Sequence, residues 1–488
     1  MVGIPALVPN LVDGKEVPAE SGKTFNKIAP ADGSVIAKVA RSAAKDVHAA
    51  VAAAKRAQPA WADRTPVERG EILRRAALRL KETAGEISGI VARETGKSPK
   101  DAAGETLGSV EMAFFVAGEG RRFYGRTTTS AVPNKQASIA RQPLGVAGLI
   151  VPANTPIPNI AWKAFPALLC GNSAVLKSSE DAPATAWAFA RVLQESGAPP
   201  GVFNVVHGLG EEAGAPLVDS PDVAVISFTG SVEVGRVIGR QAGARLAKVC
   251  LELGGKNPLI VCDDADLEAA VQAAVLSAFS NAGQRCASGS RLIVFDAVYD
   301  RFKKLILDRT EKLRVGVTDD DDFGPVISKD ALDRILSHVG KAKKRGASIL
   351  AGGHRLKGEG RDSGFYLAPT ILENVPPADP LSVTELFGPV TVLHRVKNLE
   401  EALAVANGSP FGLTAAIHTA SLHRAMVFQS KIQSGVAVVN GPTYGSEPHM
   451  PFGGLKQSGN GLREAGSEAL DVFSDWKTIY VNWKPGSA

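Results

Sequence analysis

The sequence is poor in residues that hold metals and in segments that cross membranes. Its 488 residues include only four cysteines and eight histidines, and their spacing matches no zinc motif. No apolar run is long enough to span a bilayer. Residues 1–10 lack the basic segment and the long apolar core of a secretory signal. We therefore expect a cytoplasmic protein with no metal centre and no membrane partner.

An excess of charge of one sign is also absent. The formal net charge is only +5, and the lysines and arginines are scattered along the chain, so no nucleic-acid partner is expected. Apolar residues make up 44% and charged residues 22% of the sequence, which is typical of globular proteins. A chain of this length is long enough for two or three domains and can bury a large hydrophobic core.

Three of the four cysteines stand in apolar surroundings. Cys170, Cys250 and Cys262 lie in or beside apolar runs, and a thiol in such a context usually packs as a small core residue. Few cysteines without a paired spacing are typical of a protein from a reducing compartment. These three residues are expected to be structural.

The fourth cysteine has polar neighbours. Cys286 follows Gly283-Gln284-Arg285, and earlier in the chain Glu252 stands just before the glycine pair Gly254-Gly255. Between them we expect a short buried strand at 258–262 and a helix that Asp266 caps. A thiol and a carboxylate that converge at one end of a sheet are the minimum equipment for covalent acyl chemistry.

From Val146 onward the sequence alternates between strand and helix patterns. This rhythm favours βαβ units and a parallel sheet, whose ligands bind at the carboxyl ends of the strands. Polar or Gly/Pro-punctuated loops follow three of the expected strands, at 152–156, 177–180 and 228–235. The expected strands are 146–151, 173–177, 202–206 and 223–228, and the expected helices between the first three are 158–169 and 183–195.

These motifs together resemble those of the NAD(P)-dependent aldehyde dehydrogenase superfamily. The family's glutamate motif matches residues 251–258 and its cysteine motif matches 283–286, and further matches reach from Val146 to Gly454. The resemblance implies an α/β fold with a variant Rossmann cofactor domain, an α/β catalytic domain and a small β oligomerisation domain, in a homodimer or homotetramer. The implied ranges are 1–123 and 145–254, then 255–455, then 124–144 and 473–488.

The resemblance also implies roles for three catalytic residues. Cys286 attacks the aldehyde carbon, Asn154 and the backbone N–H of Cys286 hold the oxyanion, and hydride passes to NAD. Glu252 then activates the water that hydrolyses the thioester. Taken alone, these residues would be read as a core thiol, a solvated glutamate and a turn asparagine beside Pro156. The surrounding motifs favour the catalytic roles.

The resemblance places the cofactor on the loops that follow the strands. Lys177 and Glu180 would bind the adenosine ribose. The Glu180 carboxylate would repel a 2′-phosphate, which favours NAD as the cofactor but does not exclude NADP. Gly230 and Ser231 open a helix whose N–H groups can meet a pyrophosphate, although this spacing alone would indicate only a tight turn. The other residues expected at the cofactor are Val151, Pro152, Gly210, Val234, Gly254, Glu385 for the nicotinamide ribose, and Phe387, which could also be ordinary core.

The small-molecule aldehyde itself is less closely defined. Ala153 and Thr155 flank Asn154 where the family often has aromatic residues, so we expect a more open or more polar tunnel. Arg285 could bind an anionic substrate, such as a semialdehyde with a distal carboxylate, or could be a structural ion-pair residue. Residues 442–449, which include Tyr444, could form the tunnel mouth. An aromatic aldehyde is therefore also a possible substrate. The expected tunnel residues are Thr155, Asn159, Trp162, Arg285 and Phe452.

Three other functions compete with this interpretation. A CoA-acylating aldehyde dehydrogenase needs no base to activate water, so Glu252 argues against it. A non-catalytic relative would not need Cys286, Glu252 and Asn154 together. A cysteine hydrolase would usually need a histidine partner, and none of the eight histidines stands in a motif that pairs with Cys286.

Overall fold

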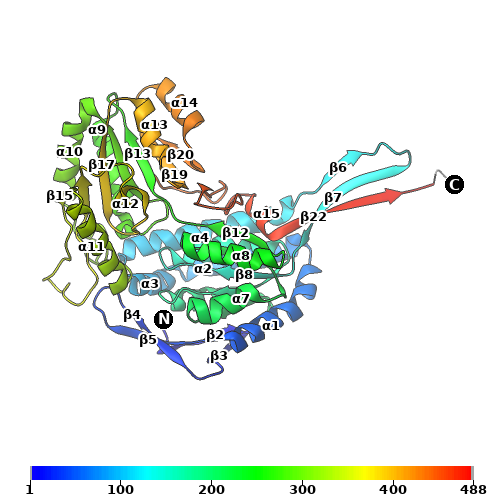
Figure 1. Cartoon of the computed structure of the whole chain (residues 1–488). Helices are drawn as coiled ribbons and strands as arrows, with labels where there is room; N and C mark the ends of the chain where they lie inside the picture. The colour runs from blue at the N-terminus through cyan, green and yellow to red at the C-terminus, as the bar shows by residue number, and fades with distance from the viewer. Residues whose placement is uncertain (1–2, 485–488) are drawn as a thin grey trace.

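Two seven-stranded sheets form the body of the molecule (Figure 1), described by the computed structural model over residues 3–484. The first sheet has the strand order β12-β11-β8-β9-β10-β2-β3. Its strands β8 to β12 are parallel, while β2 and β3 are antiparallel to their neighbours. These strands are β2 (Asn10–Val12), β3 (Lys15–Val17), β8 (Val146–Ile150), β9 (Ser173–Lys177), β10 (Phe203–Val206), β11 (Val223–Thr229) and β12 (Lys248–Glu252).

The four predicted strands of this sheet are confirmed, with ends that differ by one residue at most. Continuous apolar runs form them because the sheet is covered on both faces. The hairpin of β2 and β3 turns at Asp13 and Gly14, which both have positive φ, as its sequence indicates. Its addition to the first sheet was not predicted, because the pairing of Leu11 with Val205 joins segments far apart in the chain.

Helices pack on both faces of the first sheet. The apolar side of α1 packs with α7 and α8 on one face. On the other face α5 and α6 pack beneath α2, α3 and α4. The helix-forming residues between 43 and 118 favour a helical layer, and the structure divides these helices between the two faces, with α1 opposite to α2, α3 and α4. The bounds are α1 (Ala44–Ala62), α2 (Pro66–Glu82), α3 (Ala84–Thr95), α4 (Pro99–Glu119), α5 (Pro156–Leu169), α6 (Pro183–Glu195), α7 (Ala215–Asp219) and α8 (Val232–Ala244).

The second sheet has the order β15-β16-β17-β14-β13-β19-β20, and only β15 is antiparallel to its neighbour. The apolar run at 436–440 predicts a buried strand. It forms β20, but this strand lies at the sheet edge and is partly exposed. The strands are β13 (Asn257–Val261), β14 (Gly289–Phe295), β15 (Ser348–Ala351), β16 (Thr370–Glu373), β17 (Val390–Val396), β19 (Thr414–His418) and β20 (Val436–Val439). The helices are α9 (Leu267–Phe279), α10 (Asp296–Thr310), α11 (Lys329–Lys344), α12 (Pro380–Val383), α13 (Leu399–Asn407) and α14 (Leu422–Lys431).

A three-stranded antiparallel sheet projects from this body (Figure 1). It consists of β6 (Arg126–Thr129), β7 (Lys135–Pro143) and β22 (Ser474–Asn482), the last following α15 (Ala469–Phe473). The polar segment 127–140 predicts a projecting hairpin and the apolar segment 478–483 predicts a strand, and the structure has β6 with β7 and β22 at these places. Residues 485–488 of the implied oligomerisation segment lie outside the described residues.

Two small sheets complete the fold. Near the N-terminus β1 (Leu7–Val8), β4 (Thr24–Ile28) and β5 (Val35–Ala40) pair with one another, and β18 (Phe411–Gly412) pairs with β21 (Leu455–Lys456). Within residues 3–484 none of the helices has the length and apolar character needed to cross a membrane.

Candidate active site

A cavity of about 1080 Å³ contains most of the predicted site residues. It receives side chains from the first sheet and from the second, so the site is built between the two sheets. The predicted residues that line it are Pro152, Asn154, Thr155, Asn159, Trp162, Gly230, Ser231, Glu252, Gly254, Arg285, Cys286, Glu385, Phe387 and Phe452. Five predicted residues do not line it and lie at a strand end, on loops or at helix starts beside the first sheet: Val151, Lys177, Glu180, Gly210 and Val234.

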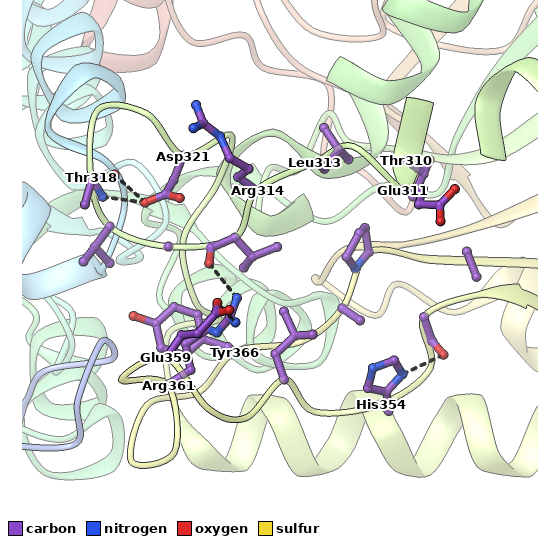
Figure 2. A pocket seen from close by; sticks show the side chains of 18 of the residues that line it. Thr310, Glu311, Leu313, Arg314, Thr318, Asp321, His354, Glu359, Arg361 and Tyr366 are labelled. Carbon is purple, nitrogen blue, oxygen red and sulfur yellow. Dashed lines mark hydrogen bonds and ion pairs between the residues drawn. The ribbon is translucent and has the colours of Figure 1, made fainter. Parts of the chain in front are cut away.

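Size alone does not identify this cavity. Another hollow of about 1030 Å³ lies beside α10 and the loop that follows it. Figure 2 shows its lining, which mixes acidic and basic side chains such as Glu311, Arg314 and Arg361. None of the predicted site residues lines it. The chemistry of the lining therefore selects the cavity at Cys286.

The thiol and the glutamate come from different sheets. Glu252 is the last residue of β12, at the carboxyl end of the first sheet, and Cys286 lies just before the amino end of β14 in the second. The expectation that both lie at one end of one sheet is therefore wrong. They approach each other because the carboxyl edge of one sheet faces the amino edge of the other across the cavity.

The turn before Cys286 is unusually constrained. Asp266 caps α9 as expected and accepts hydrogen bonds from the backbone N–H groups of Glu268 and Ala269. After α9, Asn281, Ala282 and Gly283 all have positive φ, at 53°, 54° and 66°. A Cβ on Gly283 would lie 2.2 Å from the carbonyl oxygen of Gly388. Only glycine fits there without moving the backbone.

Asn257 fixes the other side of the cysteine loop. Its Nδ2 donates to the carbonyl oxygens of Cys286, at 2.7 Å, and Ser288, at 2.9 Å. Its Oδ1 accepts from the backbone N–H of Thr414. Because Asn257 begins β13, the second sheet itself holds the backbone that carries the thiol.

Burial governs the protonation of Cys286. It raises the pKa of the thiol to about 12, and the carboxylates of Glu385 and Glu252 add to the effect. A hydrogen bond from the backbone N–H of Ala287 opposes the rise but does not cancel it. The free enzyme therefore holds a neutral thiol near neutral pH, and a base must accept its proton before it attacks.

Glu252 is a buried carboxylate without partners. It is 3% exposed, and neither carboxylate oxygen has a hydrogen-bond partner among the described residues. Burial first, and then the nearby Glu464, raise its pKa well above the usual range. Glu464 is ion-paired with the fully buried Lys163 and accepts a hydrogen bond from Ser227. This arrangement suits a group that accepts and returns protons.

Sequence reasoning missed the Lys163–Glu464 pair. Lys163 is the single charged residue of α5, in which Asn159 is the other polar side chain. It was the available signal, because a buried lysine requires an acidic partner. Glu464 is 301 residues further along the chain, and its local sequence carries no comparable signal. The fold alone brings the two together.

Two side chains hold the backbone of Asn154 in place. Lys97 Nζ and Asn281 Nδ2 both donate to its carbonyl oxygen, at 2.8 Å and 3.0 Å. Lys97 is buried and ion-paired with Glu105. These contacts link α4 and the cysteine turn to the loop that precedes α5. Neither Lys97 nor Glu105 was predicted as part of the site.

The glycine pair after Glu252 allows a close approach from the second sheet. A Cβ on Gly254 would lie 2.0 Å from Oε2 of Glu385, and the N–H of Gly255 donates to Oε1 of the same carboxylate at 3.0 Å. Burial raises the pKa of Glu385 to about 7. Glu385 is thus a buried acceptor that faces the cavity from the second sheet.

The remaining predicted cofactor residues lie where a nucleotide could extend from the cavity. Ser231 caps α8, and its Oγ accepts from the backbone N–H of Val234 at 3.3 Å. At the end of β9, Lys177 Nζ lies 2.7 Å from Oε1 of Glu180. All of these groups lie at the carboxyl edge of the first sheet, the usual ligand edge of a parallel sheet.

The wall near Cys286 combines aromatic rings with the guanidinium group of Arg285. Trp162 and Phe452 make an edge-to-face pair with centroids 5.5 Å apart. The guanidinium carbon of Arg285 lies 5.0 Å from the ring centroid of Tyr444. Arg285 Nε is buried without a hydrogen-bond partner, and Arg285 takes part in no ion pair found within residues 3–484. A structural ion-pair role for Arg285 is therefore not supported.

Sequence comparison decides the family. A family model described as the aldehyde dehydrogenase family matches residues 17–479. The chain belongs to the aldehyde dehydrogenase family. The predicted family and enzyme class are therefore confirmed, and the roles of individual residues remain predictions.

Relatives of this aldehyde dehydrogenase cover almost its full length. It is 40% identical over 475 residues to the α-ketoglutaric semialdehyde dehydrogenase of Bacillus subtilis, with 97% of each chain covered. It is 37% identical over 476 residues to an α-ketoglutarate semialdehyde dehydrogenase of Haloferax volcanii, with 97% of this chain and 99% of that one covered.

Solved structures confirm the predicted aldehyde dehydrogenase fold. A point mutant of betaine aldehyde dehydrogenase from Staphylococcus aureus, in complex with NAD+, matches with a TM-score of 0.96 and 32% identity over 99% of both chains. An aldehyde dehydrogenase from Burkholderia cenocepacia matches with a TM-score of 0.95 and 35% identity over 97% of both chains.

Proposed function

We propose that this enzyme oxidises an aldehyde bearing a distal carboxylate, of the semialdehyde class, to the dicarboxylic acid with NAD. The observation that carries the proposal is Arg285, which lines the cavity directly before Cys286 and whose Nε has no hydrogen-bond partner within residues 3–484. A guanidinium binds a carboxylate through two parallel hydrogen bonds. The two relatives described above are named as α-ketoglutarate semialdehyde dehydrogenases, which agrees with an anionic substrate.

Tyr444 strengthens this assignment. Its ring packs against the guanidinium of Arg285 at 5.0 Å, which leaves the edge of the guanidinium free to donate hydrogen bonds while the ring stabilises its charge. Glu105 is an acidic residue close enough to Arg285 for their charges to attract each other. Its carboxylate, however, is ion-paired with Lys97. The substrate carboxylate would therefore be the anion that completes the site.

The residues present fit NAD. Gly230 and Ser231 open α8 toward the cavity, where backbone N–H groups can meet the pyrophosphate. Glu385 offers a buried carboxylate for the nicotinamide ribose beside Phe387, and Lys177 with Glu180 would hold the adenosine ribose. NAD supplies the hydride acceptor when it is bound. These assignments rest on the positions of the groups around the cavity.

In the proposed mechanism Cys286 Sγ forms a bond to the aldehyde carbon as its proton passes to Glu252. The raised pKa of Glu252 makes this carboxylate a stronger base than an exposed glutamate. Asn154 Nδ2 and the backbone N–H of Cys286 donate to the oxyanion that forms. After oxidation, Glu252 releases to solvent the proton that it took from Cys286, and it is then free to take a proton from water as the water oxygen attacks the thioester carbon. The bond from that carbon to Cys286 Sγ breaks, the acid is released, and the proton on Glu252 returns to the Cys286 sulfur.

NADH formation tests the proposal directly. We would compare succinic and α-ketoglutaric semialdehydes with butanal, each with NAD or NADP and with or without CoA. The carboxylate-bearing aldehydes should give the higher kcat/KM, without a need for CoA. Cys286→Ala should form no NADH. A strict requirement for CoA would contradict the role of Glu252 and support a CoA-acylating enzyme.

Arg285 gives a test of the substrate class alone. Arg285→Gln should lower kcat/KM for a semialdehyde by about 10- to 100-fold, since a hydrogen bond to a charged group contributes about 1.5–3 kcal/mol. Turnover of butanal should change by less than about threefold, because that aldehyde has no group for Arg285 to bind. An equal loss for both aldehydes would show that Arg285 acts on the cysteine loop and not on the substrate.

A further inference from the structure

The side-chain amides of Asn154 and Asn159 meet each other within the cavity. Asn159 lies on the first turn of α5 and is partly buried. Its Nδ2 lies 3.2 Å from Oδ1 of Asn154, 2.9 Å from the carbonyl oxygen of Thr155 and 3.0 Å from Oγ1 of Thr155. Three oxygen atoms therefore surround one NH2 group.

The backbone determines which way both amides face. The carbonyl oxygen of Thr155 can only accept a hydrogen bond, so the NH2 of Asn159 must point toward it. The atom of Asn154 that meets the same NH2 must then be its oxygen, since two NH2 groups would repel each other. The Asn154 Nδ2 is left facing away from Asn159, and no hydrogen bond found in the described part of the chain uses it.

The backbone of Asn154 is fixed independently of this contact. Lys97 and Asn281 hold its carbonyl oxygen, so the main freedom that remains is rotation of the side-chain amide. A terminal amide torsion is broad and nearly two-fold, and its two orientations differ in whether nitrogen or oxygen faces the cavity. Asn159 is the hydrogen-bonding group in residues 3–484 that distinguishes these two orientations.

We propose that Asn159 is a positioning residue that sets the Asn154 amide with Nδ2 toward the reacting carbonyl. This inference rests on the proposed function, in which that nitrogen donates to the oxyanion. In the reversed orientation Asn154 would present its own oxygen to the developing negative charge and would raise the barrier. Asn159 thus acts through Asn154 and not by contact with the reacting atoms.

Asn159→Leu, of similar size, tests the proposal by removing the hydrogen bonds. Oγ1 of Thr155 would lose its donor, while the Thr155 carbonyl oxygen would keep the backbone N–H of residue 159. The Asn154 NH2 would then be free to turn toward Oγ1. We expect kcat to fall by about tenfold, within the loss of about 10²–10³ that follows complete removal of an oxyanion donor. KM for the semialdehyde should change by less than about twofold, because the oxyanion exists only in the transition state.

Asn159→Asp sharpens the test because it replaces the NH2 by oxygen with little change in shape. The carboxylate would attract the Asn154 NH2 and repel its oxygen, so the loss in kcat should exceed that of Asn159→Leu. For both variants an unchanged thermal midpoint and unchanged NAD+ binding would show that the fold and the cofactor site are intact.

A double-mutant cycle decides whether Asn159 acts through Asn154. In an Asn154→Ala background, Asn159→Leu should change kcat by less than about twofold. If the full tenfold loss persists there, or if the loss falls on KM, Asn159 contacts the substrate and the inference is overturned. An active wild type with an unimpaired Asn159→Leu variant would overturn this inference alone. A wild type that oxidises no aldehyde would remove the basis of both proposals.

Discussion

Burial makes the reacting groups of this site differ from their exposed counterparts. The pKa of Cys286 is raised to about 12, mainly by burial and then by Glu385 and Glu252, while the pKa of Glu385 is raised to about 7. The same residues on a surface would be unremarkable titrating groups. Their reactivity therefore depends on how the cavity removes water from them.

The pKa of Cys286 predicts how fast the free enzyme is alkylated. Because thiolate is the reactive form, the rate with iodoacetamide should still rise about tenfold per pH unit above pH 8. Glu385→Gln removes a charge that raises the pKa, so it should speed alkylation at a fixed pH. Peptide mass spectrometry would follow Cys286 itself, with Cys286→Ala as the control. A rate that levels off near pH 7 would contradict the assignment.

Glu180 predicts the choice of cofactor. If its carboxylate lies at the adenosine ribose, Glu180→Ala should raise kcat/KM with NADP by about tenfold or more and lower it with NAD, because repulsion of the 2′-phosphate is removed. The measurement is the ratio of the two values. Glu195→Ala, at the far end of α6, is the matched control and should leave the ratio unchanged. An unchanged ratio in Glu180→Ala would place the ribose elsewhere.

At the scale of elements, the loops between strands and helices carry the site. The turn after α9 depends on three consecutive residues with positive φ, Asn281 to Gly283, and it ends at the reactive thiol. A buried apolar helix and a buried apolar strand flank this turn and supply the stability that offsets its strain.

Substitution of Gly283 tests whether the turn before Cys286 requires glycine. Gly283→Ala should lower the free energy of unfolding by more than about 1 kcal/mol and abolish most activity, because its φ of +66° is unfavourable for alanine and the Cβ meets the Gly388 backbone. Gly340→Ala within α11 is the control. Its Cβ meets nothing within 4 Å, so it should be neutral or stabilising by up to about 1 kcal/mol. Urea titration and NADH formation would measure both, and equal behaviour would contradict the role of the turn.

At the scale of the whole molecule, the projecting sheet leaves apolar side chains exposed. Tyr480 is 59% and Val481 50% exposed on β22, and Trp476 and Ile479 are also partly exposed. An edge strand with exposed apolar residues is suited to pairing with another chain. The predicted homo-oligomer would use this surface.

Sedimentation would test this surface. Val481→Asp should shift the wild-type oligomer toward smaller species, because it places a charge on the expected contact. Leu422→Asp is the control and should sediment like wild type, since Leu422 is 77% exposed on α14, which lies well away from β22 (Figure 1). An oligomer unaffected by Val481→Asp, or a monomeric wild type, would exclude β22 as the contact.

Much of the molecule follows from local sequence. The apolar runs at 146–151 and 173–177 became strands, and Asp266 caps α9, because these features act over a few residues. The aldehyde dehydrogenase motifs around Glu252 and Cys286 identified the family, since each motif is contiguous. The chemistry of an acyl-forming thiol could be predicted before any coordinate was known.

Only the tertiary structure decided how the site is assembled. Glu252 and Cys286 come from facing edges of two sheets, Lys163 meets Glu464 across 301 positions of sequence, and Asn159 reaches Asn154 only in the geometry of the first turn of α5. Arg285 has no ion-pair partner within residues 3–484, because the nearby Glu105 is paired with Lys97. Such contacts depend on long-range packing, which a local pattern of residues does not encode.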